Sequence, residues 1–537
     1  MVVASPLLTA FLICAASWGL LRLLRRRFLK SPLDNIPGPA PTSLWQGNVS
    51  QYFHRHGSDF HRHLAQDYGS VVKLYGLYCI PMLIVQDPKA LHNILIKEEG
   101  VFEESKLFIK TNHYLFGPGL ISTLGEHHHK QRKMLNSVFA INHMRSLVPT
   151  FYGIVHKLQE ALTTEVQSGP RELNILFWMG RAALELVGQG GLGYSFDPLV
   201  RDAEDDYGEA LKTLFPTLQG LIVFRQLLPY VDWIGPRWFR AFVMDHFPHA
   251  GVRKLKYNVD KMSETATAIF RAKKEALGVG LESDPEQIGG GKDIMTTLVK
   301  ANMAASDSDR LPDDELVAQM STIILGAMDT TSNILSRTLQ NLAARPEMQD
   351  RLRNEVMAAY SGEDLTYDEV MQLPYLDAVC RETLRLYPPV TFLTRVAKRD
   401  AVLPLHFPVV GRNGQTMSEI HVPKGTKIIL GTLGSNTSKA KWGEDALEWK
   451  PERWLAPLPR TVTDVAAPGV FSHFGFKFSE LEMKILLMML LSNFTFALSD
   501  KPIVWNLAPI SFPSVGMESS QPSMPLIVTP LRKNEKP

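Results

Sequence analysis

The stretch "PDDELVAQMSTIILGAMDTTSNILSRTLQNLAARP", residues 312–346, predicts one long helix. Acidic residues 313–315 occupy its first turn, where negative charge suits the helix dipole, and Pro346 marks its end. Residues 320–327, in its middle, are uncharged and mostly apolar, as expected for a helix buried at the centre of a large domain. The stretch therefore predicts a mainly helical body built around this segment.

The middle of this helix contains "GAMDTTSN", residues 326–333, which is poor helix-forming material. Gly326 and Ala327 are small enough to let a large planar ligand lie against the backbone. The Thr330 hydroxyl can bond back to the helix, and together with the Asp329 carboxyl it can relay protons. The alternative is a helix kink at a packing contact.

Helical periodicity dominates the rest of the chain, and only short strands are expected. The predicted strands are 71–75, 81–86 and short pieces within 390–430, and the predicted helices are 88–97, 126–139, 149–166, 173–192, 375–386 and one starting near Ser479. Residues 278–292 are Gly-rich and predict a surface loop. The remainder of the C-terminal third is rich in Pro and is predicted to be irregular.

Two further motifs carry charged residues in apolar surroundings. In "RETLRLYPPV", residues 381–390, Glu382 and Arg385 share one helix face, and a buried pair of this kind must be fully hydrogen-bonded. In "WKPERWL", residues 449–455, Arg453 can complete a bidentate network with Glu382. The alternatives are a surface ion pair for the first motif and a surface Arg stacked on Trp454 for the second.

Composition excludes some classes of protein. The chain has 537 residues, 45% of them hydrophobic, and a net charge of +2, which gives no reason to expect a nucleic-acid partner. Its three cysteines are too few for a disulfide framework and contain no C-x-x-C pair, so a reducing compartment and no structural zinc site are expected.

The N-terminus predicts a membrane anchor. Residues 4–21 are mostly apolar and are followed by arginines at 22 and 25–27, a charge order that suits a signal anchor with the rest of the chain in the cytoplasm. We expect a transmembrane anchor over residues 4–24, a basic and Pro-rich linker over 25–48 and a single catalytic domain over 49–537. A buried N-terminal helix is the alternative for the first segment.

In their order and spacing, these motifs resemble the cytochrome P450 family, specifically membrane-anchored haem-thiolate monooxygenases of the fungal type. The resemblance implies a cytochrome P450 fold, mainly α with a small β part, behind an N-terminal transmembrane helix. It implies a b-type heme that inserts one oxygen atom from O2 into an apolar organic substrate, by analogy a polycyclic or terpenoid compound. Electrons would come from NADPH through a membrane-bound reductase, on the cytoplasmic side of the endoplasmic reticulum membrane.

The resemblance assigns roles to the central motifs. Gly326 and Ala327 match the oxygen-activating motif of the central helix, although the family usually has Gly where Ala327 stands. Thr330 matches the alcohol that steadies iron-bound oxygen, and Asp329 matches its acidic partner. Glu382, Arg385 and Arg453 match the family's Glu-Arg-Arg triad, whose role is structural.

The resemblance also names partners for the haem propionates. In "GEHHHKQRK", residues 125–133, His128 and Arg132 match the family's motif of Trp or His followed four positions later by Arg. Arg395 matches a second propionate-binding Arg. We expect His127 and His129 to face solvent, and we expect no metal site in this run because consecutive histidines cannot all face one ion.

The stretch "PGVFSHFGFKFSELEMK", residues 468–484, matches the family on both sides of a gap. By resemblance, the loop that carries the haem-ligating Cys is missing between His473 and Phe474. His473 falls in the register of that Cys, and we interpret it as the ordinary residue before the gap. The existing cysteines do not replace it, because Cys14 lies in the predicted anchor, Cys79 among the N-terminal strands and Cys380 on the triad helix.

Three accounts of the gap follow. The chain is the product of a wrongly assigned intron or of splicing, or it is a catalytically inactive membrane-anchored binding or regulatory relative, or it is a His-ligated haem protein. The first is favoured, because a chain released from selection for catalysis should also have lost Thr330, Arg132 or Arg395, and all three are present.

Overall fold

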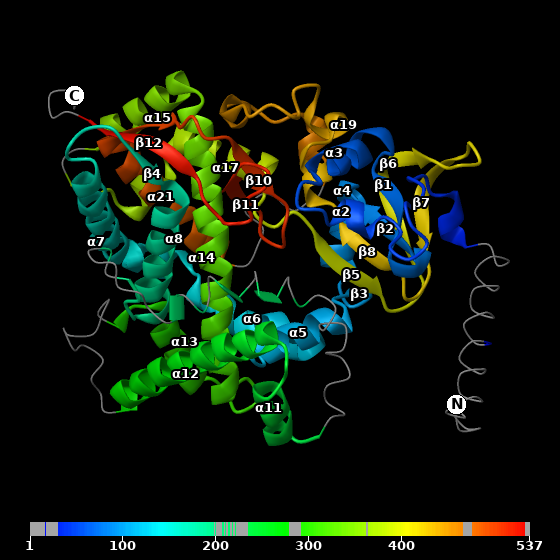
Figure 1. Cartoon of the computed structure of the whole chain (residues 1–537), viewed down its shortest axis with the longest axis horizontal. Helices are drawn as coiled ribbons and strands as arrows, with labels where there is room; N and C mark the ends of the chain where they lie inside the picture. The colour runs from blue at the N-terminus through cyan, green and yellow to red at the C-terminus, as the bar shows by residue number, and fades with distance from the viewer. Residues whose placement is uncertain are drawn as a thin grey trace, which may run out of the picture.

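A computed structural model describes residues 17, 31–197, 199, 207–208, 210, 213–214, 217–218, 221, 235–278, 291–360, 363–465 and 475–531. Figure 1 shows a large helical part and a smaller part that holds most of the strands. The prediction of a mainly helical protein with a small β part is confirmed.

Most helices with eight or more residues lie in the large part, whereas α3 (Ser58–Asp67) lies in the smaller part (Figure 1). The other helices of this length are α5 (Lys106–Phe116), α6 (Gly125–Val138), α7 (Ile141–Glu165), α8 (Ile175–Leu186), α11 (Arg237–Asp245), α12 (Ala250–Gly278), α13 (Ile294–Ala304), α14 (Asp313–Ala343), α15 (Pro346–Ala359), α17 (Pro374–Leu386) and α21 (Phe476–Asn493). Shorter helical segments are η1 (Pro32–Asn35), α2 (Val49–Tyr52), η2 (Leu77–Cys79), α4 (Pro88–His92), η3 (Asn93–Lys97), η4 (Leu120–Ser122), η5 (Val187–Leu192), α16 (Tyr367–Met371), α18 (Thr432–Asn436), α19 (Lys439–Trp442), η8 (Pro451–Trp454) and α20 (Arg460–Thr463).

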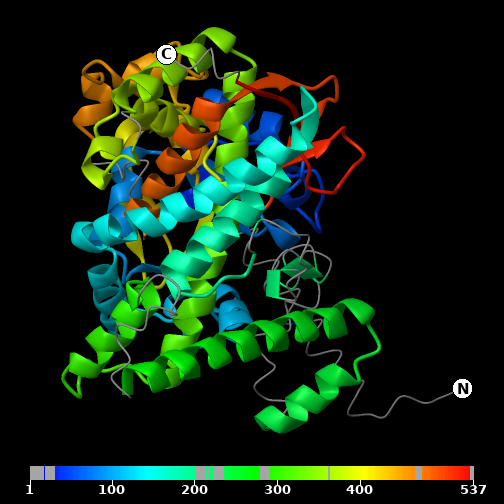
Figure 2. The ribbon, with the colours of Figure 1, turned by 90° about the vertical axis from the view of Figure 1, so that its left-hand side faces the viewer.

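Helix α14 is the long central helix that the sequence predicts. It begins after Pro312 and ends at Ala343, and α15 starts at Pro346. It packs against α8, α12, α17 and α21, so most of its side chains are buried. Figure 2 shows α12 as the long green helix across the lower edge of the molecule, with α11 beside it. Burial on several sides explains why the middle of α14 is apolar all round.

The largest sheet joins strands from distant parts of the chain. Its order is β1 (Val71–Tyr75), β2 (Pro81–Val85), β8 (Lys427–Leu430), β5 (Leu393–Ala397) and β3 (Phe102–Glu103). The predicted strands at 71–75 and 81–86 are therefore confirmed as an antiparallel pair, β1 with β2. β2 then pairs with β8 in parallel, and nearly all residues of these strands are buried.

The C-terminal third contains strands where the sequence predicts irregular structure, and that prediction is wrong. β4 (Arg171–Asn174), β12 (Pro525–Pro530) and β9 (Phe494–Leu498) form one sheet, and β10 (Ile503–Asn506) pairs with β11 (Phe512–Val515). By contrast, β6 (Ala401–Val410) and β7 (Thr416–Val422), which pair with each other, lie where short strands are predicted within 390–430. The predicted helix 173–192 likewise starts as strand β4, because Leu173 pairs with Leu526 of β12. These pairings bring together partners far apart in sequence, which local patterns do not reveal.

The N-terminal segment from residue 31 is packed onto the body. Leu33 and Ile36 are buried in a cluster with strands of the largest sheet, and Gly38 lies so close to the Lys73 carbonyl that a side chain would collide with it. The predicted anchor, residues 4–24, lies outside the described residues except for Ser17. Within the described ranges, no helix is both long and apolar enough to cross a bilayer.

Candidate functional site

The middle of α14 presents bare backbone at Gly326. Gly326 is exposed, and a Cβ added there would meet no atom within 4 Å. The Thr330 hydroxyl donates a hydrogen bond of 2.6 Å to the Gly326 carbonyl, so it bonds back onto the helix as the sequence predicts. Ala327, the next residue, is buried. This stretch therefore offers open space on one side and a hydroxyl one turn further along.

Asp329 lies beside this opening and is partly exposed. Burial raises the pKa of its carboxyl to about 6. An acid whose pKa lies near the working pH can both take up and release a proton. The predicted pair Asp329 and Thr330 thus combines a carboxyl of near-neutral pKa with an adjacent alcohol.

A second acid near this pair is Glu482 of α21, which sequence reasoning did not single out. Its side chain is fully buried, and Thr331 of α14 donates a hydrogen bond of 3.1 Å to Oε2. Oε1 has no hydrogen-bond partner among the described residues. Burial raises the pKa of Glu482 well above its usual value, more strongly than the Thr331 bond lowers it. Burial at the contact between α14 and α21 therefore favours the neutral form of this carboxyl.

Helix α6 carries the predicted propionate partners. His128 is partly buried and Arg132 is exposed one turn further along. Burial and the Arg132 charge lower the pKa of His128, and Glu104 opposes them. Arg395 of β5 forms an ion pair of 2.9 Å with the same Glu104, although burial still lowers the pKa of Arg395. Glu104 thus pairs directly with Arg395 and acts electrostatically on His128, and Arg132 acts on the same His128.

The prediction that His127 and His129 face solvent is confirmed, but each of them also contacts a carboxylate. Both are half-exposed, but His127 contacts Glu315 of α14 at 2.9 Å and His129 contacts Glu99 at 3.1 Å. Gln131, fully buried on the same helix, donates to Glu315 at 2.7 Å. This polar contact ties α6 to the first turn of α14. Sequence reasoning missed it because the contact joins residues 184 positions apart.

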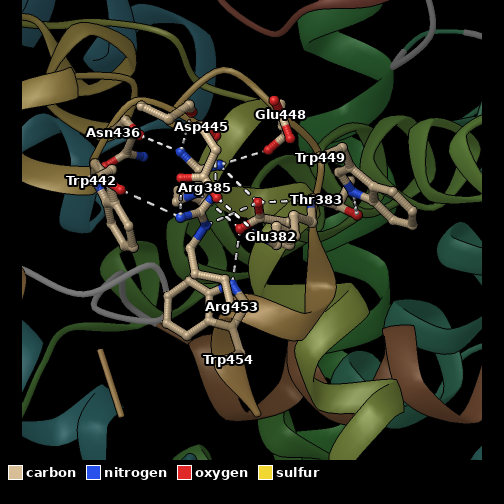
Figure 3. Close-up of polar contacts among 12 residues, drawn as sticks. Glu382, Thr383, Arg385, Asn436, Trp442, Asp445, Glu448, Trp449, Arg453 and Trp454 are labelled. Carbon is tan, nitrogen blue, oxygen red and sulfur yellow. Dashed lines mark hydrogen bonds and ion pairs between the residues drawn. The ribbon is translucent and has the colours of Figure 1, made fainter. Parts of the chain in front are cut away.

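The Glu382 carboxylate is the centre of a buried network (Figure 3). Glu382 and Arg385 of α17 both have fully buried side chains, and two N–H groups of Arg385 bond to the carboxylate at 2.8 Å each. The other N–H groups of Arg385 donate to the backbone carbonyls of Asn436, Ala446 and Glu448. The guanidinium is therefore fully satisfied, and the alternative of a surface ion pair is excluded.

Arg453 joins this network from η8. Its Nε lies 3.4 Å from Glu382, and its other nitrogens bond to the Asp445 side chain and backbone at 2.9 Å. Trp454 donates its indole N–H to Glu382 at 2.9 Å, and the Lys450 backbone N–H adds another bond of 3.0 Å. Arg453 is buried, so the alternative of a surface Arg is excluded as well. The structure brings all three predicted triad residues together.

Burial and neighbouring charges act in opposite directions on the ionisation of Glu382. Burial raises its pKa, but the hydrogen bonds and charge of Arg385, together with the N–H groups of Lys450 and Trp454, outweigh burial and hold the pKa below its usual range. The carboxylate is therefore ionised in the folded protein and locks α17 to the segment 436–454.

The cysteines of the described chain are poor candidates for an axial haem ligand. Cys79 lies between β1 and β2 with its Sγ 3.5 Å from the Ser43 carbonyl. Cys380 is fully buried in α17, and burial raises the pKa of its thiol to about 12. Cys14 and the junction between His473 and Phe474 lie outside the described residues. The basic residues on α6 and β5 suit the carboxylates of a haem, but the described residues offer no suitable thiolate for its iron.

Comparison with known proteins agrees with this geometry. The family model "Cytochrome P450" matches residues 37–515. Cytochrome P450 monooxygenase 81 of Postia placenta is 54% identical over 95% of this chain and 95% of its own, and monooxygenase 212 of the same fungus is 51% identical over 96% and 98%. Ganoderic acid synthetase CYP5150L8 of Ganoderma lucidum is 42% identical over 97% of this chain and 98% of its own.

The acid and alcohol on the central helix and the buried Glu-Arg-Arg network are the features expected of an oxygen-activating monooxygenase, the class to which the relatives belong. The chain belongs to the cytochrome P450 family. Enzymes of this family use a haem cofactor and receive electrons from a redox partner.

Proposed function

We propose that the functional form of this protein is a haem-dependent monooxygenase that inserts one oxygen atom from O2 into an apolar organic substrate. We further propose that this form contains a Cys-bearing loop between His473 and Phe474. The observation that carries the proposal is the intact pair of Asp329 and Thr330, with its opening at Gly326, in a chain whose relatives are named monooxygenases.

The described residues have defined roles in this proposal. Asp329 and Thr330 hold and pass protons at the carboxyl and hydroxyl oxygens, for which a pKa of about 6 suits Asp329. Gly326 and Ala327 leave room for a flat cofactor beside α14. His128, Arg132 and Arg395 hold the haem propionates. Arg395 already makes a charge-assisted contact of this kind with Glu104, and a propionate would take the place of that carboxylate. The haem, when bound, supplies the oxygen chemistry.

The cellular setting is also part of the proposal. The apolar residues 4–21 and the arginines that follow support a single-pass anchor in the endoplasmic reticulum membrane, with the catalytic domain in the cytoplasm and electrons supplied by an NADPH-dependent reductase. The anchor prediction is tested by carbonate extraction of membranes from expressing cells. Extraction of the full chain into the soluble fraction would overturn it, and removal of residues 1–24 is the control.

The experiment compares three full-length chains by the reduced, CO-bound absorption spectrum. The first is this sequence, the second carries a family-like Cys loop between His473 and Phe474, and the third carries the same loop with Ser at the Cys position. We expect the Soret band typical of thiolate ligation in the second chain alone. A second chain that folds but binds no haem would contradict the proposal. It would favour the alternative of a catalytically inactive membrane-anchored binding or regulatory relative.

A further inference from the structure

A cavity of about 320 Å³ lies one turn beyond Asp329 and Thr330, and nothing above assigns a ligand to it. Its wall includes Asn333 and Arg337 of α14, Tyr387 and Thr391 after α17, and Trp505 of β10. Much of the remaining wall is apolar, with Ile334, Leu386, Pro388, Leu433, Leu447 and Leu507. A space of this size, mostly apolar and with a few polar groups, has the build of a small-molecule site.

Three polar atoms around this cavity are buried and have no hydrogen-bond partner among the described residues. They are Asn333 Oδ1, Arg337 Nε and Thr391 Oγ1. An unpaired buried polar atom costs about 1–3 kcal/mol, so three around one cavity are costly unless something fills it. The Asn333 amide nitrogen is already used, since it donates to the Asp329 carbonyl at 2.8 Å. The free atoms on the wall therefore call for a ligand that has polar groups.

The charge of the cavity wall indicates which kind of ligand the cavity binds. The described wall contains three basic residues, His61, Arg62 and Arg337, and no Asp or Glu. Burial lowers the pKa of His61, which favours its neutral form, and Arg62 pairs with Asp59. Arg337 makes no ion pair with a described carboxylate, so its charge is the one on this wall that lacks a counter-ion.

The Arg337 guanidinium is nevertheless held in one place. Its carbon lies 3.7 Å from the centre of the Tyr387 ring and 4.6 Å from the centre of the Trp505 ring. Gln340 accepts a bond from Arg337 at 3.3 Å and a bond from the Trp505 indole at 2.8 Å. Because two aromatic rings already fix this guanidinium, it loses little conformational entropy when it binds an anion. This favours a tight bidentate contact.

We propose that this cavity binds an apolar carboxylic acid whose carboxylate pairs with Arg337 and bonds to the Thr391 hydroxyl. The apolar body of the acid lies against the leucines and Ile334. Because the cavity adjoins the Asp329 turn, we infer that this acid is a substrate or product. That inference rests on the proposed function. Binding of the acid does not depend on that function.

The test is calorimetric titration of the full chain at pH 7.5 with adamantane-1-carboxylate, a compact apolar cage with one carboxylate. Its neutral counterpart, adamantane-1-carboxamide, is titrated alongside. We expect the wild type to bind the carboxylate, and Arg337→Gln to weaken that binding about tenfold or more without changing binding of the amide, since a charged hydrogen bond is lost. Thr391→Val should weaken carboxylate binding a few-fold while keeping the side-chain volume.

The matched control is Arg62→Gln, which removes the same charge from the same cavity but from a residue that is half-exposed and already paired. Its affinity for the carboxylate should equal that of the wild type. The proposal is overturned if the wild type does not bind the carboxylate, if Arg337→Gln binds it equally well, or if both Arg variants lose affinity equally. Should Arg337→Gln fail to fold, Thr391→Val carries the test.

A haem propionate is another source of carboxylate, and a further arm separates the two sources. Displacement of adamantane-1-carboxylate by haemin, but not by haemin dimethyl ester, would assign Arg337 to the cofactor and overturn the free-acid proposal. The calorimetry requires neither haem nor turnover. A negative CO spectrum with positive binding therefore counts against the proposed monooxygenase alone, and the reverse result counts against the carboxylate site alone.

Discussion

Replacing Glu382 by Gln should destabilise the protein strongly although the two side chains have the same shape. The carboxylate receives two bonds from Arg385, one each from Trp454 and the Lys450 backbone, and a longer contact from Arg453. A neutral amide leaves both guanidinium groups without their central counter-ion in a buried site. The NH2 group of the introduced Gln would also face N–H donors, because N–H groups surround both oxygens of the Glu382 carboxylate.

The expected magnitude follows from the burial of this pair. Removing one partner of a buried ion pair costs about 3–5 kcal/mol. With an unfolding entropy of ~2.1 cal/mol/K per residue over roughly 490 residues, 1 kcal/mol shifts the melting temperature by about 1 °C. We therefore expect E382Q to melt about 3–5 °C below the wild type if the domain unfolds as one unit.

The assay is thermal unfolding by circular dichroism at one fixed scan rate, since a large domain often unfolds irreversibly. The matched control is E452Q, the same chemical change on the neighbouring segment. Glu452 pairs with Arg351, and their side chains are 34% and 50% exposed, so its loss should cost at most about 1 kcal/mol. Equal melting temperatures for E382Q and E452Q would refute the reasoning.

The destabilisation of E382Q relative to the wild type should also depend on pH. The folded pKa of Glu382 is lower than the unfolded one, so its contribution is complete above the unfolded value and is lost as the pH falls toward the folded value. The difference in melting temperature between wild type and E382Q should therefore shrink on acidification below about pH 4.5. A difference that stays constant down to pH 3 would show that charge is not its origin.

Three other substitutions are informative. D329N should gain about 1–3 kcal/mol of stability relative to the wild type as the pH rises from 4 to 8, because the folded pKa of Asp329 is raised to about 6 and its ionisation costs stability. Urea titrations at pH 4 and pH 8 measure the free energy of unfolding of both proteins. A difference between the two proteins that is the same at both pH values would count against burial of this acid. E482Q should also gain stability relative to the wild type as the pH rises from 4 to 8, because the pKa of Glu482 is raised well above its usual value. A variant that instead loses stability relative to the wild type with rising pH would mean that the carboxylate is ionised and paired. D87A should lower the free energy of unfolding by about 2–4 kcal/mol, because the fully buried Asp87 accepts bonds from backbone N–H groups at the start of α4 and in β6. A shift in the urea midpoint that corresponds to less than about 1 kcal/mol would contradict this prediction.

The elements predicted well from sequence are those with local signals. Helix α14 has acids in its first turn and Pro near both ends, so its length could be read directly. The triad was expected because Glu382 and Arg385 share one helix face, and the resemblance to a known family supplied Arg453. Strands β1 and β2 show a β-rich pattern interrupted by a turn. Apart from the contact of Arg453, which lies 71 positions from Glu382, the deciding signals lie within a few residues of one another.

The features missed from sequence depend on partners that local patterns do not identify. Glu482 looks like an ordinary helix residue until Thr331 of another helix is placed beside it. Gln131 gave no signal, because its partner Glu315 belongs to α14. The sequence predicts a helix where β4 begins, because the pairing of β4 with β12 joins residues about 350 positions apart. Arg337 was part of the quoted helix, but only the fold shows its two aromatic neighbours.

The parallel pairing of β2 with β8 has a consequence for synthesis on the ribosome. Val85 pairs with Leu430, so the β1–β2 hairpin emerges long before the strand that completes its sheet. At ~5–20 residues per second, the roughly 340 intervening residues take about 20–70 s to make. During that interval an apolar strand edge stays unpaired, which is the kind of surface that promotes aggregation. The nascent chain should therefore depend on chaperones until residue 430 has left the ribosome.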